Sequence, residues 1–132
     1  MNYLIDYGKL IVAFLGRILG WVLGGLDALI YALIVFIIID YITGIMLAIK
    51  NKTLSSEVGY KGIIKKILIL IIVSMGNIMD NYILNTGSTL RTLIIMFYLA
   101  NEGISILENA GILGLAIPQK LKDAIQKLSS DT

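Results

Sequence analysis

Residues 28–49 read ALIYALIVFIIIDYITGIMLAI, and Asp40 is the single charged residue in the stretch. As a helix these residues rise about 33 Å, which matches a bilayer hydrocarbon core of roughly 30 Å. A transmembrane barrel strand would alternate apolar and polar residues, and this stretch does not alternate. A helix also satisfies its own backbone hydrogen bonds, as a segment that crosses lipid must. The stretch therefore predicts a transmembrane α-helix.

Two more apolar stretches, residues 63–82 and 90–110, predict two further transmembrane helices. Of the 132 residues, 58% are hydrophobic and 15% are charged, whereas soluble domains average about 25% charged residues. The chain has neither cysteine nor histidine, which removes thiolate metal sites and the commonest general base. A net charge of +2 is too small to indicate a nucleic-acid partner. We expect a single all-α integral membrane domain over residues 1–132, with no catalytic site, cofactor or metal.

The N-terminal residues 3–26 predict an amphipathic helix that either spans the membrane or lies at its surface. One 100° face of the helical wheel carries charged and small residues. These are Asp6, Lys9, Gly16, Arg17, Gly20, Gly24 and Asp27. Glycines four residues apart allow helix backbones to approach closely in lipid. This face either packs on the protein's own next helix or forms an oligomerisation or pore face with neighbouring copies.

Polar residues also interrupt the predicted spans. Asp40 is followed one turn later by Thr43 and Gly44, and an acid inside a membrane is a functional candidate. The alternative is an acid at the membrane interface that bonds Thr43 or pairs with a lysine such as Lys50. A second polar stripe comprises Asn101, Glu102, Ser105, Glu108 and Asn109. It is either an amphipathic helix end that emerges into the cytoplasm or a polar face that meets other copies or a water path.

Basic residues in short connectors predict the orientation. Residues 50–66 contain five lysines and one acid, so we expect this connector and the C-terminus to be cytoplasmic. The connector at residues 80–91 is then external. Residues 118–128 predict a short amphipathic helix with Pro118 in its first turn, suited to an anionic cytoplasmic leaflet. The alternative for this segment is a frayed soluble tail.

Two sequence motifs stand out in the chain. The first is DYITG at 40–44, with Ala48, LSS at 54–56 and Lys65. The second is NEGISILEN at 101–109, followed by Gly114, Ile117-Pro118 and Leu121-Lys122. With these motifs, residues 27–128 resemble the toxin-secretion/phage-lysis holin family. The resemblance implies a phage-encoded, multi-pass protein of the bacterial host's cytoplasmic (inner) membrane. It implies a homo-oligomer that forms lesions in the lipid bilayer, through which an endolysin or a large toxin is released.

The holin hypothesis has two competitors. A small proton-coupled multidrug exporter would use Asp40 or Glu102 as its protonatable site, and its length and helix count would fit this chain. Against it, the polar residues are spread over three helices, and the two motifs have no place in such a protein. The third hypothesis is an inert subunit of a larger membrane complex.

Overall fold

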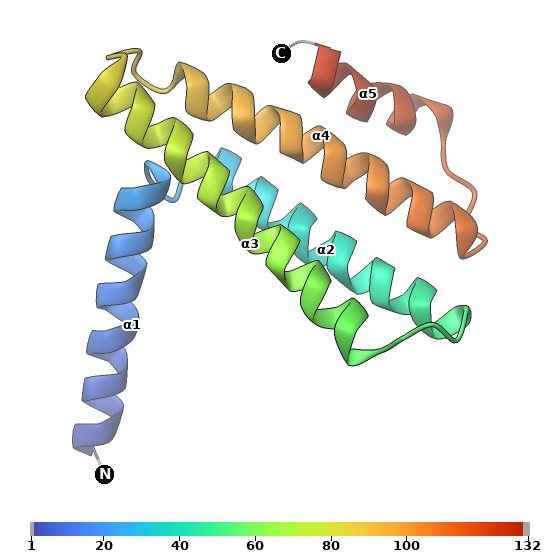
Figure 1. The fold of residues 1–132 in the computed structure, drawn as a ribbon, viewed down its shortest axis with the longest axis horizontal. Coiled ribbons are helices and arrows are strands. Elements are labelled where there is room, and N and C mark those ends of the chain that lie inside the picture. Colours follow the sequence, from blue (N-terminus) through green and yellow to red (C-terminus); the bar gives the residue numbers. More distant parts are fainter. Residues whose placement is uncertain (1, 131–132) are drawn as a thin grey trace.

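The computed structural model describes residues 2–130, which form helices and connectors without any strand. The elements are α1 (Asn2–Leu23), α2 (Ala28–Lys50), α3 (Ser56–Ile78), the π-helical turn η1 (Met79–Ile83), α4 (Thr89–Ile112) and α5 (Gln119–Ser130). Helices α2, α3 and α4 form a bundle, α1 diverges from it, and α5 folds back along α4 (Figure 1). The all-α prediction is confirmed.

Three helical stretches are long and apolar enough to cross a membrane, namely Ala28–Lys50, Ser56–Ile83 and Thr89–Ile112. Their outer surfaces are apolar as well. Exposed side chains on this surface include Ile38, Ile42, Met46, Ile64, Leu68, Ile71, Met75 and Phe97. So much contiguous apolar surface is unfavourable in water and favourable in hydrocarbon. The bundle is therefore an integral membrane domain.

The helix starts follow from capping side chains rather than from hydropathy. Asp27 accepts the backbone N–H of Ile30 at 3.0 Å and caps α2. Ser55 accepts the N–H of Val58 at 3.1 Å and caps α3. The second span consequently starts at Ser56 and not at residue 63, and much of the expected 50–66 connector is helix. Side-chain oxygens at this position satisfy N–H groups that the first turn leaves unpaired.

Helix α1 ends three residues earlier than expected, at Leu23. Gly24 and Gly25 have φ values of +86° and +109°, a region that other residues rarely adopt. The N–H of Gly25 returns to the carbonyl of Gly20 at 2.6 Å and closes the helix. The polar face predicted for residues 3–26 is therefore wrong at its C-terminal end, because Gly24 and Asp27 do not continue the wheel of α1.

The core lies where α2, α3 and α4 meet. Its buried side chains are Leu23, Ile30, Leu33, Ile37, Ile69, Val73, Ile95 and Leu99. These residues recur every three or four positions along each helix, which is the spacing that keeps side chains on one helical face. The packing fixes which polar residues point inward with them.

Helix α5 packs against α4 and does not extend away from the bundle. A Cβ atom built on Gly103 of α4 would lie 2.9 Å from Ile125 of α5 and 3.2 Å from Phe36 of α2. Leu128 packs against the bundle core. The sequence predicts a helix on the surface of a lipid leaflet, whereas the structure holds α5 against the helices of its own bundle.

Candidate functional site: two buried polar clusters

The first cluster, the Lys66 cluster, consists of Asp40 on α2, Lys66 on α3 and Glu102 on α4. The ammonium of Lys66 donates to an oxygen of Asp40 and, at 2.6 Å, to Oε2 of Glu102. The side chains of Lys66, Asp40 and Glu102 are only 18%, 9% and 8% exposed. One cation therefore lies between two carboxylates and joins all three membrane-spanning helices.

Amide and hydroxyl groups complete the surroundings of Asp40. Asn109 donates its Nδ2 group to Asp40 at 3.2 Å and to the hydroxyl of Thr43 at 3.0 Å. Ser105 bonds the same carboxylate, and Gly44 lies beside Asn109. These neighbours hold Asp40 in place from α4, across the helix interface.

The predicted alternative for Asp40 is right that the acid pairs with a lysine, but the lysine is Lys66 and not Lys50. The hydroxyl of Thr43 donates to the carbonyls of Ile39 and Asp40 at 3.0 Å each. Lys50 donates to the carbonyl of Ile112 at 3.0 Å instead of pairing with Asp40. The acid is buried inside the bundle, and its cationic partner is Lys66.

The polar stripe of α4 divides into an inner and an outer part. Glu102, Ser105 and Asn109 turn toward Asp40 and Lys66, whereas Asn101 and Glu108 are exposed. The wheel places all five within about 120°, and the bundle covers only one side of that arc. The predicted stripe is therefore not one continuous face toward other copies.

The second cluster, the Arg91 cluster, consists of Asp27, Asp80 and Arg91 at the opposite end of the bundle. The guanidinium donates to the carbonyl of Leu23 at 2.5 Å and to that of Gly25 at 3.1 Å. It also donates to the two oxygens of Asp27 at 2.9 and 3.2 Å. Arg91 is 3% exposed, and its planar fork binds the backbone turn and the carboxylate together.

Asp80 is fully buried and caps a helix other than its own. It accepts the N–H groups of Leu90 and Arg91 at 3.0 and 2.8 Å, and the hydroxyl of Thr86 at 2.5 Å. Ser88, at the N-cap position of α4, makes no side-chain cap bond. The carboxylate therefore satisfies the first turn of α4 and lies near the positive end of its dipole.

These groups anchor the last turn of α1 to the bundle. Asn77 of α3 donates to the carbonyls of Trp21 and Val22 at 3.3 and 3.0 Å, and Asn81 donates to Asn77 at 2.8 Å. Asp27 is half exposed, and its bond to Arg91 lowers the pKa of its carboxyl against the opposing effect of burial. Asp27 therefore contributes to an intramolecular anchor.

The rest of the predicted α1 face has few neighbours within the chain. Asp6, Lys9 and Arg17 are exposed, and a Cβ on Gly16 would meet nothing within 4 Å. A Cβ on Gly20 would meet only the side chain of Leu26, at 3.6 Å. The expectation that these glycines pack on the protein's own next helix is therefore wrong for Gly16 and Gly20.

Sequence reasoning missed Lys66, Asn77, Asp80 and Arg91 as site residues. Lys66 counts as one of the lysines of the 50–66 connector and also falls at the start of the predicted span 63–82, directly before the apolar run that starts at Ile67. A lysine and an arginine at opposite ends of predicted spans, each needing an acid on another span, were the available signal.

Comparison with known proteins identifies a matching family and several similar proteins. A model of the bacteriophage holin family matches residues 17–130. An uncharacterized 14.9 kDa protein of Clostridium perfringens is 42% identical over 130 residues, which cover 98% of each chain. An uncharacterized Listeria monocytogenes protein is 44% identical, over 95% of this chain and 86% of its own.

A further relative carries a functional name. A protein of Bacillus phage phi105 named as a probable holin is 36% identical over 99 residues, covering 75% of this chain and 73% of its own. No solved structure matches the chain. The family model covers α2, α3, α4 and α5, and so includes both buried clusters. The chain belongs to the bacteriophage holin family.

Proposed function

We propose that this protein assembles into homo-oligomers in the cytoplasmic membrane of a bacterium and forms lesions there. The cargo is an endolysin that must reach the cell wall, or in a variant of the same role a large toxin. The family to which the chain belongs supports this proposal, as does the phage relative named as a probable holin.

The observation that carries the assembly step is the state of α1. This helix has 22 residues, and Leu23 is the only one of its described residues that is buried. Its polar face combines the half-buried Gly16 and Gly20 with the exposed Asp6, Lys9 and Arg17. Small residues favour close helix contacts in lipid, and charged residues there are stabilised by partners or water. Neighbouring copies supply both.

Charge supports an orientation with the Lys50 end of the bundle in the cytoplasm. Lys66 belongs to the buried cluster and no longer counts as a connector charge. Lys50, Lys52, Lys61 and Lys65 remain near this end. The lysines of α5 come in sequence after the Ile112 end of α4, which lies beside Lys50. An excess of lysine on one side of the membrane marks the cytoplasmic side. A reporter fused after residue 132 should be active only when it is of a kind that folds in the cytoplasm.

The exporter alternative has less support. Its candidate protonatable groups, Asp40 and Glu102, are both bonded to Lys66. The relatives described above include a probable holin. The lesion hypothesis also accounts for the exposed face of α1, for which a self-contained exporter bundle has no use.

The deciding experiment is induction of the gene in bacteria that co-express a cytoplasmic endolysin. The proposal predicts an abrupt stop of growth followed by lysis, and a stop without lysis when the endolysin is omitted. Native-membrane crosslinking in the same cells should show oligomers that grow before the stop. Continued growth at high membrane levels of the intact protein, with only monomer after crosslinking, would refute the proposal.

A further inference from the structure

Helix α5 lies alongside a segment of α4 that is long enough to span the membrane. Ile125 contacts Gly103, which is nine residues from the end of α4 at Ile112. At 1.5 Å per residue that is about 13 Å into a helix about 36 Å long. Lys127 lies about 3 Å further along α5, because α5 runs back toward the Thr89 end of α4 (Figure 1). The C-terminal half of α5 thus reaches close to the middle of the bundle.

The face of α5 that points away from the bundle is polar. Its exposed residues include Gln119, Lys120, Asp123 and Lys127. The exposed Lys122 and Gln126 lie at the edge of this face, beside α4. A charged residue near the centre of a bilayer costs roughly 2.5–3.5 kcal/mol on insertion scales. Docking brings no compensating hydrophobic gain in lipid, since hydrocarbon solvates Leu121 and Ile125 as well as the bundle does. In this position the outer face of α5 is incompatible with a lipid environment.

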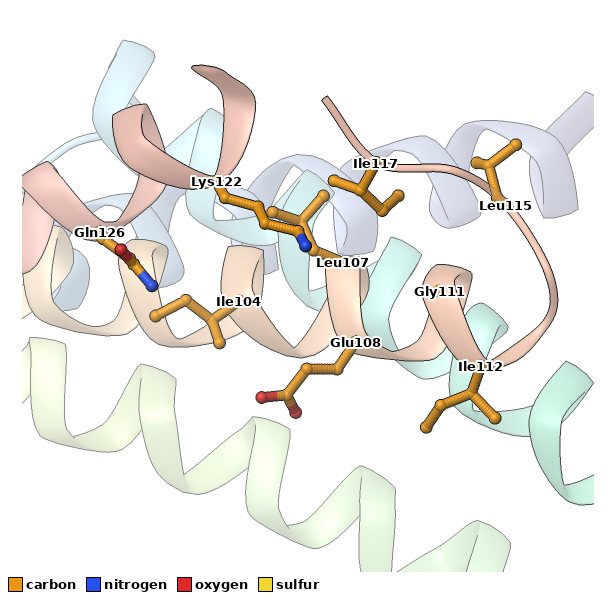
Figure 2. A pocket seen from close by; sticks show the side chains of 9 residues that line it. All are labelled: Ile104, Leu107, Glu108, Gly111, Ile112, Leu115, Ile117, Lys122 and Gln126. Carbon is orange, nitrogen blue, oxygen red and sulfur yellow. The ribbon is translucent and has the colours of Figure 1, made fainter. Parts of the chain in front are cut away.

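The space between α4 and α5 is also suited to water. A cavity of about 540 Å³ lies between α4 and α5. Helix α4 contributes Glu108 to its lining, and α5 contributes Lys122 and Gln126 (Figure 2). Ile104 and Leu107 form part of its apolar wall. A water molecule occupies about 30 Å³ in the liquid, and polar groups on two sides can bond such waters. Charged groups at this cavity are solvated if the cavity opens to an aqueous space.

We propose that the docked α5 lines the water-filled passage of the assembled lesion, with Lys120, Lys122, Asp123 and Lys127 facing the lumen. The inference rests on the proposed oligomeric lesion. In the unassembled chain, no water borders this part of the bundle, and α5 moves to the lipid–water interface beside the Lys50 end. Assembly brings α5 back along α4, where Gly103 leaves room for Ile125.

Distance measurement between two spin labels tests the position of α5. The chain has no cysteine, so Ser88→Cys at the start of α4 and Lys127→Cys on α5 would be its only two thiols. When α5 is docked on α4, the two labels are about 20–25 Å apart. This distance combines the rise of about 13 helical residues along α4 with one spacing between neighbouring helices. With α5 at the interface they are about 36 Å apart or more. The labelled protein is diluted into the unlabelled natural chain in vesicles, so that only distances within one chain are measured.

The expected result is the long distance at low protein-to-lipid ratio and the short distance at high ratio, where crosslinking shows oligomers. Ile125→Ser should keep the long distance at both ratios, while Ala124→Ser at a neighbouring exposed position should behave as the parent. A long distance in assembled, lytically active protein refutes the lining role and leaves the lesion proposal standing. A short distance in the monomer refutes the idea that α5 docks on α4 only where water borders its outer face. If the chain forms no oligomers at any ratio, the proposed function itself fails.

Discussion

Removal of the ammonium at Lys66 is the sharpest test of the bundle. Lys66→Met keeps the apolar stem and leaves two carboxylates that are less than 10% exposed without their cation. Asp40 retains the amide of Asn109 at 3.2 Å, whereas Glu102 loses the bond from Lys66. Breaking one partner of a buried ion pair costs about 3–5 kcal/mol. We expect a loss of that size in the free energy of unfolding.

The assay is steric trapping in lipid bicelles, which measures the unfolding free energy of a membrane protein without removing its lipid. Lys65→Met is the matched control, because it removes the same charge from the neighbouring exposed position. It should cost less than about 1 kcal/mol. Equal losses for the two variants would show that the cluster contributes no specific stability and would refute the reasoning.

A compensated variant separates lost charge pairing from lost packing. The triple variant Asp40→Asn, Lys66→Met, Glu102→Gln has no charge in the cluster and nearly the same volume. Buried ion networks are often replaceable by neutral groups of similar size, so we expect recovery to within about 1–2 kcal/mol of the natural chain. A triple variant no more stable than Lys66→Met alone would show that the unpaired carboxylates are not the cause of the loss.

Three further outcomes are expected. Arg91→Lys should release α1 from the bundle, because a single ammonium cannot reach all the carbonyls and the carboxylate that the guanidinium binds. Proteolysis at residues 24–26 should then accelerate roughly tenfold or more. Arg91 lowers the pKa of Asp27, so the stability that the ionised Asp27 adds to the folded state is complete above the unfolded pKa of about 4. That stability is lost as the pH falls through the lower pKa of the folded state. Fluorescence of Trp21, the single tryptophan, should therefore stay constant from about pH 7 to 5 and change below about pH 4, and Asp27→Asn should abolish that change. Gly20→Leu should reach the membrane at normal levels but lose large oligomers and lysis. Gly8→Leu, which lies off the polar face, should keep both. Unchanged lysis timing in Gly20→Leu would show that this face makes no contact between copies.

Local hydropathy was enough to establish the all-α membrane class and the approximate location of the three spans. The bilayer imposes a minimum length of apolar helix, and that requirement can be assessed one segment at a time. The family motifs at 40–44 and 101–109 were visible in the same way, because they are contiguous. Asp40 and Glu102 were recognised as unusual because a charge within lipid is costly wherever its partner lies.

The partners themselves were decided only by tertiary structure. Lys66 is 26 residues from Asp40 and 36 from Glu102, and helix packing alone determines that the three meet. The end of α1 at Leu23 likewise depends on Arg91, which binds a carbonyl 68 residues away. A helical wheel describes a single helix, so it extended the α1 face to Asp27 and joined Glu108 to the inward residues of α4. Which side of a helix is covered, and by what, follows from the register between helices, and no single segment contains that information.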